Sequence, residues 1–442
     1  MEKGASEQQP RGPRVQPCAS GAQRTSAKPS GESEGQENST VSPEQVAALM
    51  PSASAALLAF ALELHQKLRE VGGSRNVLFS PFLAAGALIA LYHGARGRAA
   101  RHLARLLHLE CDAPSAVAYF AHCHERLFAS WPNHQRQGFN ATHDLALIRD
   151  RNLNMLAAYV AALSPWCRTE PDFFEADMGS AAIRMDLWIR ALTSFAFREY
   201  TVFGFPPTTG RDPVLLVSIA VLFVKGRWRQ RFEQSHGDFH ESPTKMRAVR
   251  VMKRRGRFRV GDCGDLDALA LEIPYQDPNK CMVVFLPRME RLATFEHSLT
   301  PAKLLCCLAN MQEKEVDVTM PVLKLKRHTE LAPIVSLLGT PDVFKSRGQL
   351  GGISDDKSLF VSTLTHVTVF HANARGGRAV SNEVQSTTSA TTAASVAPAE
   401  VVKFTVDRPF MFLVMSKDPD AVLLMGSVRK VASRKSKALA VA

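Results

Sequence analysis

The sequence predicts an α+β protein, because helical patterns come early in the chain and strand patterns come late. In the early part, Leu57, Phe60 and Leu64 recur at the spacing of one helix face. In the late part, ALALEIPY (268–275) and CMVVFLP (281–287) flank the turn QDPNK, which is the pattern of a buried hairpin. With 442 residues, of which 45% are hydrophobic, the chain is long enough to bury a large core.

Composition divides the chain into segments. Residues 1–51 are rich in Ser, Gly, Gln, Pro and Glu, and the first aromatic residue is Phe60. A segment without aromatic residues buries too little surface to offset its chain entropy, so the sequence predicts a disordered tail there. We expect one folded domain over residues 52–432 and a basic tail over residues 433–442.

Turn residues divide the folded part into elements. Gly72 and Gly73 end the first helix, NVLFSPF (76–82) is a short buried strand, and a second helix follows from Leu83 to His93. Later segments with strand patterns are 316–326, 359–372, 410–415 and 421–428. The first of these alternates between apolar and polar residues, so we expect a single half-buried strand.

The folded part of the chain carries its positive charge. The formal charge is +12, whereas residues 1–49 contain five Lys or Arg against six Glu. Such a surface attracts acidic polysaccharide or nucleic acid, and the alternative is that it only keeps the protein soluble. The longest apolar run, from Phe82 to Tyr92, is shorter than the roughly 20 residues that a membrane helix needs, so we expect no membrane span.

The residues that usually carry metal or enzyme chemistry do not form known motifs. None of the eight cysteines forms a CxxC pair or a Cys/His cluster with zinc spacing, so we expect buried thiols and not a disulfide framework. The sequence also lacks GxSxG, HExxH and a glycine-rich phosphate loop. We therefore expect no metal, no cofactor and no enzymatic activity.

A series of motifs in fixed order resembles the serpin family, whose members inhibit proteases with a bait loop. The motifs, spread over residues 52–432, are NVLFSPF, GARGRAARHLARLLHL, LFVKGRWRQRF, VTMPVLKLK, LLGTPDVF, LGGISDDKSLFVS and FTVDRPFMFLVM. The resemblance implies a serpin fold, with helices packed on a large mixed β-sheet, smaller sheets and an exposed reactive-centre loop at about residues 376–404. It also implies a monomer that binds a protease and, after cleavage, inserts the loop into the large sheet as a strand.

The hinge of this loop departs from the family pattern. By resemblance it comprises Ala374, Arg375, Gly376, Gly377, Arg378, Ala379 and, further on, Glu383. Ala374 and Arg375 replace an acidic pair, and Gly377 replaces a threonine. Alternate residues of a strand face one side, so insertion would point Glu383 at the core, where an unpaired carboxylate is costly. The alternative is a partial insertion that leaves Glu383 in water.

The bait bond falls in a stretch of small residues. Counting from the hinge places it after Ala390, and counting back from Pro409 places it near Val396 and Ala397. No Arg, Lys, Phe, Tyr, Leu or Met lies in this window, so only small-pocket, elastase-like proteases fit it. The alternative is a flexible tether that no protease uses productively.

The residues of the shutter, where a serpin sheet opens, match the family only in part. His366 matches a family position, as does Trp228 in LFVKGRWRQRF, whereas Leu83 and Ala220 stand where the family has Ser and Asn. Two functional classes therefore stay open. One is a serine-protease inhibitor, and the other is a non-inhibitory serpin that acts as a binding or carrier protein.

The run KMRAVRVMKRRGRFR (245–259) holds eight basic residues in fifteen, with Arg254, Arg255 and Arg257 near its centre. Such a run could bind a sulfated polysaccharide or a phosphate backbone by releasing counterions, and the alternative is a solvated basic turn. The family resemblance implies an extracellular protein. The N-terminus, which has no stretch like a secretory signal, favours the cytoplasm or nucleus.

Overall fold

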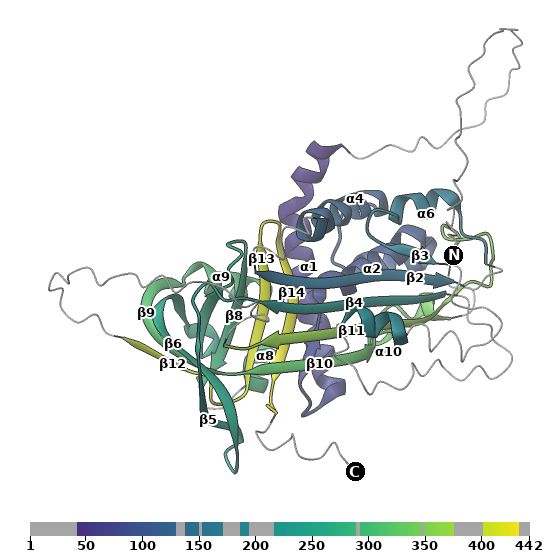
Figure 1. Cartoon of the computed structure of the whole chain (residues 1–442). Helices are drawn as coiled ribbons and strands as arrows, with labels where there is room; N and C mark the ends of the chain where they lie inside the picture. Colours follow the sequence, from purple (N-terminus) through teal and green to yellow (C-terminus); the bar gives the residue numbers. More distant parts are fainter. Residues whose placement is uncertain are drawn as a thin grey trace, which may run out of the picture. The chain divides into compact units, whose positions relative to one another are not determined.

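The structure, a computed structural model, describes residues 42–129, 138–149, 153–170, 186–193, 216–288, 292–345, 349–374 and 401–432 (Figure 1). The strands of this part of the chain form two β-sheets, and helices pack around and between them. This arrangement confirms the predicted α+β class.

The sheet that concerns function has five strands among the described residues, in the order β10-β11-β4-β2-β3. Their bounds are β2 Phe139–Arg149, β3 Arg168–Glu170, β4 Leu216–Gly226, β10 Leu323–Glu330 and β11 Val361–Ala372. β4 pairs with β11 in parallel and with β2 in antiparallel, so the sheet is mixed. The two central strands are almost entirely buried, as expected of apolar, β-branched runs covered on both faces.

The larger sheet is antiparallel over most of its width and follows the order β1-β14-β13-β8-β7-β6-β9-β12, with β5 paired to β6. Its strands are β1 Val77–Phe79, β5 Glu233–Ser242, β6 Lys245–Cys263, β7 Ala268–Pro274, β8 Lys280–Pro287, β9 Gln312–Pro321, β12 Val402–Thr405, β13 Phe410–Lys417 and β14 Asp420–Val428. The pairing of β7 with β8 confirms the hairpin predicted from ALALEIPY and CMVVFLP.

The helices of the described part are α1 Pro43–Gly72, α2 Pro81–Gly94, α3 Gly97–Leu106, α4 Ala113–His124, α6 Ala157–Leu163, α8 Leu292–Ser298, α9 Pro301–Ala309 and α10 Ala332–Leu337. Short turns of helix occur at η1 Glu125–Ala129, η3 Gly264–Leu266 and η5 Pro341–Phe344, and residues 186–192 are also helical. α2 contacts both β4 and β14 and is buried almost all round, so it lies between the two sheets. Ser80 begins it, because its hydroxyl accepts from the N–H of Leu83.

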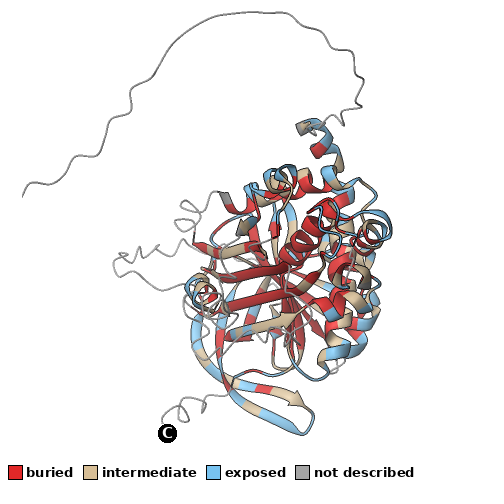
Figure 2. Cartoon of the chain, turned by 90° about the vertical axis from the view of Figure 1, so that its right-hand side faces the viewer, coloured by how far each residue is buried: buried red, intermediate tan, exposed pale blue. Residues whose placement is uncertain are grey.

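One continuous core joins both sheets. The strands β4 and β11 of the five-stranded sheet are buried along most of their length, whereas the hairpin of β5 and β6 is largely exposed (Figure 2). Trp228 and Phe410, from distant parts of the sequence, are both buried in this core. A smaller cluster on the opposite face of the five-stranded sheet includes Ile189, from the helical residues 186–192, and Val367 of β11.

The first helix begins at Pro43 and not near Ser52, as the composition suggests. The cause is a capping box that the composition does not reveal. The Ser42 hydroxyl accepts from the N–H of Gln45, the Gln45 side chain accepts from the N–H of Ser42, and Pro43 occupies the first helical position.

The segment 316–326 is two strands and not one. β9 ends at Pro321 and lies in the larger sheet, whereas β10 begins at Leu323 and lies in the five-stranded sheet. Val322 alone connects them, and its N–H donates to the carbonyl of Arg250. Pro321 has no N–H to donate to a ladder, so a break of the strand at this position is favourable.

Helix α1 has the length and apolar composition of a membrane span. One of its faces is buried in the protein, where Phe60, Ala61 and Leu64 belong to the core. The apolar character of this helix is therefore accounted for by packing.

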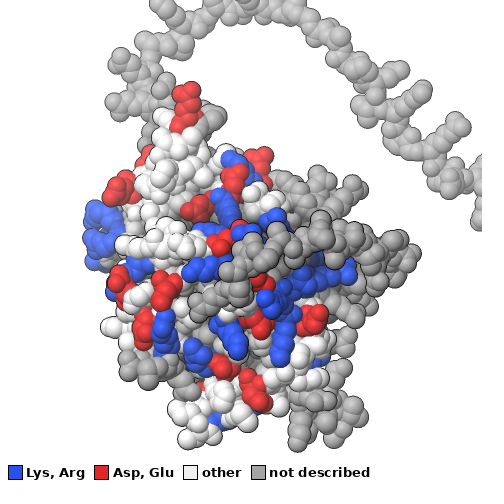
Figure 3. Space-filling model, turned by 90° about the vertical axis from the view of Figure 1, so that its left-hand side faces the viewer, with Lys and Arg blue, Asp and Glu red and all other residues white. Residues whose placement is uncertain are grey.

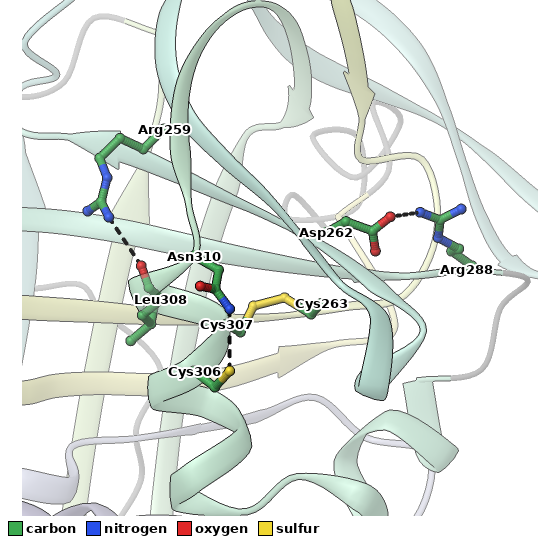
Figure 4. The surroundings of a disulfide bond; sticks show 8 residues. All are labelled: Arg259, Asp262, Cys263, Arg288, Cys306, Cys307, Leu308 and Asn310. Atoms are coloured by element: carbon green, nitrogen blue, oxygen red, sulfur yellow. Dashed lines mark hydrogen bonds and ion pairs between the residues drawn. A yellow bond between two sulfur atoms is a disulfide. The ribbon is translucent and has the colours of Figure 1, made fainter.

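A disulfide joins Cys263, at the end of β6, to Cys307 of α9 (Figure 4). Their Cα atoms are 5.2 Å apart, within the normal range for a disulfide. The expectation of thiols only is therefore wrong for this pair, because two residues 44 positions apart in the sequence are neighbours only in the fold. Cys123, Cys167 and Cys281 are buried free thiols, as expected.

Candidate functional site

The candidate site is the seam between β4 and β11, which we call the β4–β11 seam. The two strands are direct parallel neighbours from Val361 opposite Leu216 to His371 opposite Lys225, with one irregularity near Thr363. Long connections join the two strands, as parallel neighbours require. At this seam, a further strand could be added only if β4 and β11 separated.

His366 lies in the middle of the seam and faces the core. Its Nε2 accepts a hydrogen bond of 2.8 Å from the backbone N–H of Ser80, at the start of α2. Ala220 is its neighbour across the seam on β4, and Thr329 of β10 is its neighbour on the other side. The ring is 1% exposed. His366 therefore ties the sheet to the helix beneath it.

The imidazole of His366 is held in its neutral form. Burial is the larger cause and the charge of His328 the smaller, and together they lower the pKa of His366 to about 3. The hydrogen bond acts in the same direction, because a protonated Nε2 would meet the N–H of Ser80 donor to donor.

Several polar atoms in the seam lack hydrogen-bond partners among the described residues. They include Oγ of Ser218, Nδ1 of His366 and Oγ1 of Thr368. All three residues point to the core face of the sheet, which they share with Leu222 and Phe370. An unpaired buried polar group costs about 1–3 kcal/mol. The paired arrangement of β4 and β11 therefore leaves these three side chains without the hydrogen bonds that they could form.

Trp228 fastens the chain that follows β11. Its Nε1 donates to the carbonyl of Asn373 at 2.9 Å, and its ring stacks on Tyr275 with a centroid distance of 4.6 Å. The N–H of Phe232 donates to the carbonyl of Ala374 at 3.3 Å. The segment after β4 therefore holds the first residues of the loop in place.

Of the predicted loop residues, Ala374 is among those that the structure describes, and it is buried. The other hinge positions and the bait candidates lie outside the described residues: Arg375, Gly376, Gly377, Arg378, Ala379, Glu383, Ala390, Val396 and Ala397. The described chain resumes before β12, which pairs with β9 in the larger sheet. The loop thus runs from the end of one sheet to the edge of the other.

The structure places the predicted shutter residues in different elements. Ala220 is buried directly across the seam from His366, and Leu83 is buried in α2, three residues after Ser80. The sequence did not point to Ser80, whose backbone contacts His366 and whose hydroxyl caps α2. The Ser-Pro pair before an apolar run was the available signal, because it is typical of a helix start.

Five of the eight basic residues in the run 245–259 form ion pairs with carboxylates on the described strands β5, β7 and β9. Arg255 Nε lies 2.8 Å from Glu315 Oε1, and Arg257 lies 3.5 Å from Glu313. Arg254 is exposed and forms no ion pair with any residue in the described ranges. Figure 3, which views the molecule from the side of β6 and β9, shows Lys and Arg side chains interspersed with Asp and Glu. The run is therefore not a uniform basic patch.

An apolar cavity of about 410 Å³ lies between α1, α9 and the β13–β14 hairpin. Its lining includes Met50, Leu57, Phe82, Leu304, Leu305 and Met415. Asp420 lies at its edge, and burial raises the pKa of this carboxyl. Within the described ranges, no three His, Cys, Asp or Glu side chains are grouped so as to hold a metal ion. Chemically, the cavity suits a small apolar molecule.

Known proteins resemble this chain over most of its length. A family model described as Serpin (serine protease inhibitor) matches residues 55–431. Iris of Ixodes ricinus is 30% identical over 403 residues, which cover 85% of this chain and 98% of Iris. Leukocyte elastase inhibitor A of Mus musculus is 28% identical over 395 residues, 86% of this chain and 99% of that protein. Among solved structures, human thyroxine-binding globulin is similar with a TM-score of 0.73 at 18% identity, over 87% of this chain and 100% of that chain. This chain belongs to the serpin family of serine protease inhibitors.

Proposed function

We propose that the chain traps serine proteases by inserting its loop into the β4–β11 seam. The observation that carries the proposal is the direct parallel pairing of β4 with β11, at the end of which the loop begins. A cleaved loop could add a strand between them and pair its backbone with both. The bound protease would move with the loop and be distorted before it could release itself.

The unpaired polar atoms of the seam support this proposal. Ser218, His366 and Thr368 lie on one face, where an inserted strand would run beside them. Serine, threonine and backbone groups of that strand could supply the missing partners. Insertion would then relieve a cost of about 1–3 kcal/mol for each group, in addition to forming new ladder hydrogen bonds.

The small residues of the loop suit an elastase-like protease. A shallow specificity pocket accepts Ala390, Val396 or Ala397 at the bait position and excludes large side chains. The relative named leukocyte elastase inhibitor A supports the same class of partner. We further propose that the chain is a monomer, as the family resemblance implies.

The test is incubation with pancreatic elastase, followed by a denaturing gel and mass spectrometry of the released peptide. A covalent complex and a cut after Ala390 or near Val396 support the proposal. The melting temperature of the cleaved protein is expected to rise well above that of the intact protein, because the loop becomes a strand. Cleavage without a complex and without a rise in melting temperature rejects trapping.

A second candidate function, as a carrier, is favoured by the apolar cavity. The cavity volume of about 410 Å³ is within the range of small-molecule sites, and its walls are mainly Leu, Met and Phe side chains. Leu305 lines it and is 44% exposed, so a ligand could reach the cavity from solvent. This function does not require the loop to insert.

The carrier candidate is tested with Nile red, a neutral apolar fluorophore. Saturable fluorescence enhancement that is lost in Leu305→Arg supports it. The control is Leu337→Arg on α10, where the leucine is 66% exposed and lies outside the cavity lining. No saturable signal with the wild-type protein, or equal loss in both variants, rejects the candidate.

For the location we propose the extracellular space, with the cytoplasm or nucleus as the alternative. The Cys263–Cys307 disulfide supports a compartment that permits disulfides. Mass spectrometry of secreted and cytosolic fractions decides between them, and a protein found only in the cytosol removes the extracellular assignment.

A further inference from the structure

Three cysteines meet where strand β6 reaches helix α9. Cys263 ends β6 and is bonded to Cys307 of α9, and Cys306 is the residue before Cys307. The two bonded cysteines are each 5% exposed, whereas Cys306 is an exposed free thiol. Figure 4 shows Cys306 beside the disulfide, with its sulfur accepting a hydrogen bond of 3.4 Å from Nδ2 of Asn310. A thiol that solvent reaches therefore adjoins a disulfide that solvent hardly reaches.

Burial protects this disulfide from thiols in solution. A disulfide opens when a thiolate attacks one of its sulfur atoms, so the rate depends on access to those atoms. A thiol from solvent meets the buried Cys263 and Cys307 only rarely. Cys306 is not limited in this way, because it follows α9 in every motion and lies in the last turn of the helix, which ends at Ala309. Consecutive residues are rotated by about 100° around a helix, so a local unwinding of this turn brings Cys306 to Cys263.

The exchange has two balanced steps. In the first, the Cys306 thiolate attacks Sγ of Cys263, and Cys307 leaves with the electron pair and takes up the proton that Cys306 lost. Attack on Cys307 is disfavoured, because a disulfide between consecutive residues closes a small ring that strains the planar peptide bond between them. In the second step, a small-molecule thiol from solvent attacks the Cys306 sulfur and releases Cys263 as a thiol. One disulfide is lost and one is formed, so no oxidant is needed.

Helix α9 is also a wall of the apolar cavity. Leu304, Leu305 and Leu308 of this helix line the cavity, and Cys307 ties the helix covalently to β6. Arg259 of β6 adds a weaker tie, because its Nη2 donates to the carbonyl of Leu308 at 3.1 Å. Opening of the disulfide removes the covalent tie. A ligand must then order this wall when it binds, and the cost of ordering lowers its affinity.

We propose that Cys306 is the site at which a small-molecule thiol becomes attached, that this attachment opens the Cys263–Cys307 disulfide, and that opening weakens ligand binding in the apolar cavity. The last part rests on the carrier function proposed above, whereas the attachment and the opening do not. Coupling between two sites is reciprocal, so a bound ligand must in turn disfavour the opening.

The first experiment follows the chemistry at the three cysteines. The full chain is incubated with reduced glutathione without oxygen, free thiols are trapped with N-ethylmaleimide, and the peptides are analysed by mass spectrometry. Glutathione is expected on Cys306, and maleimide on Cys263 and Cys307. In Cys306→Ser, opening of the disulfide is expected to be at least about tenfold slower, because the relay is lost. The matched control is Cys111→Ser, which removes a partly exposed thiol between α3 and α4 and should change the rate less than about twofold.

The second experiment measures the cavity. Nile red is titrated into the closed and the glutathione-modified protein, at a temperature at which circular dichroism shows both to be folded. The modified protein is expected to bind at least about threefold more weakly, and saturating Nile red should reduce the fraction of protein that glutathione opens. Cys306→Ser after the same treatment is expected to remain closed and to keep the affinity of the untreated protein.

Each remaining outcome overturns a stated part of the proposal. Opening of Cys306→Ser at the wild-type rate, or glutathione on Cys263 or Cys307, rejects the relay. Equal Nile red affinity of the closed and opened proteins rejects the coupling to the cavity. Absence of Nile red binding to both forms rejects the carrier function and the coupling with it, while mass spectrometry still decides the attachment site. Cys306→Ala serves as a second variant, and unfolding curves of both variants check the fold.

Discussion

Ser80 and His366 are 286 positions apart in the sequence, yet the backbone N–H of one donates to Nε2 of the other at a distance of 2.8 Å. The bond joins the start of α2 to the centre of the β4–β11 seam. It also defines which nitrogen of the imidazole is unprotonated, since Nε2 must act as the acceptor. This contact therefore makes the stability of the fold depend on pH.

Acid is expected to destabilise the protein through His366. Its pKa is lowered from 6.5 to about 3 in the folded state, so below pH 6.5 the unfolded chain takes up a proton that the folded chain does not. The contribution of His366 to the free energy of unfolding is therefore fully present above pH 6.5. As the pH falls from 6.5 towards the folded pKa, this contribution decreases by up to about 1.4 kcal/mol per pH unit. Urea unfolding of His366→Gln, whose amide oxygen can still accept from Ser80, should show a shallower decline. His236→Gln, on the exposed side of β5, is the control, and an equal slope in wild type and His366→Gln contradicts the prediction.

Trp228→Phe is expected to lower the free energy of unfolding by about 1 kcal/mol, since it removes the hydrogen bond to Asn373 and keeps a ring on Tyr275. The matched control is Tyr275→Phe. The hydroxyl of Tyr275 is buried and has no hydrogen-bond partner among the described residues, so its removal should be neutral or slightly stabilising. Both values come from urea unfolding, and a Tyr275→Phe loss as large as that of Trp228→Phe would contradict the prediction, because it would mean that the Tyr275 hydroxyl contributes as much as the hydrogen bond to Asn373.

Removal of the disulfide is expected to destabilise the protein strongly. By the loop-entropy estimate, a link across 44 residues contributes about 4 kcal/mol, so Cys263→Ala with Cys307→Ala should melt well below the wild type under non-reducing conditions. Cys306→Ser alters the exposed neighbouring thiol and should leave the melting temperature unchanged. Equal melting of all three proteins would mean that the cysteines are not linked in solution.

Glu383→Ser is expected to raise the fraction of elastase that is trapped relative to the fraction of inhibitor that is merely cleaved. The reason is that an inserted strand would otherwise bury a carboxylate. Asn382→Ser changes the adjacent residue, which faces the opposite side of a strand, and should have little effect. Densitometry of complex and cleaved bands provides the ratio. If the two variants behave alike, Glu383 is not buried on insertion.

The fold was largely predictable because its long elements have clear patterns. The β7–β8 hairpin and the buried Trp228 follow from apolar runs and from motif order. The exact start of α1 could not be predicted in this way, because it depends on a capping box formed by two residues and not on hydrophobicity. The ion pairs of the basic run on β6 could not be predicted for a different reason. Two of the carboxylates involved lie on β9, more than fifty residues later, and only strand pairing brings them close.

The single residue between β9 and β10 links the two ends of the bait loop. The loop begins after β11, which pairs with β10, and ends at β12, which pairs with β9. Because only Val322 separates β9 from β10, the loop and these four strands form a closed circuit of chain and hydrogen-bonded ladders. If β10 and β11 move away from β4, as the proposed insertion requires, they remain joined to β9 by Val322. We therefore expect the opening of the sheet to be coupled mechanically to β12, the anchor of the loop on β9.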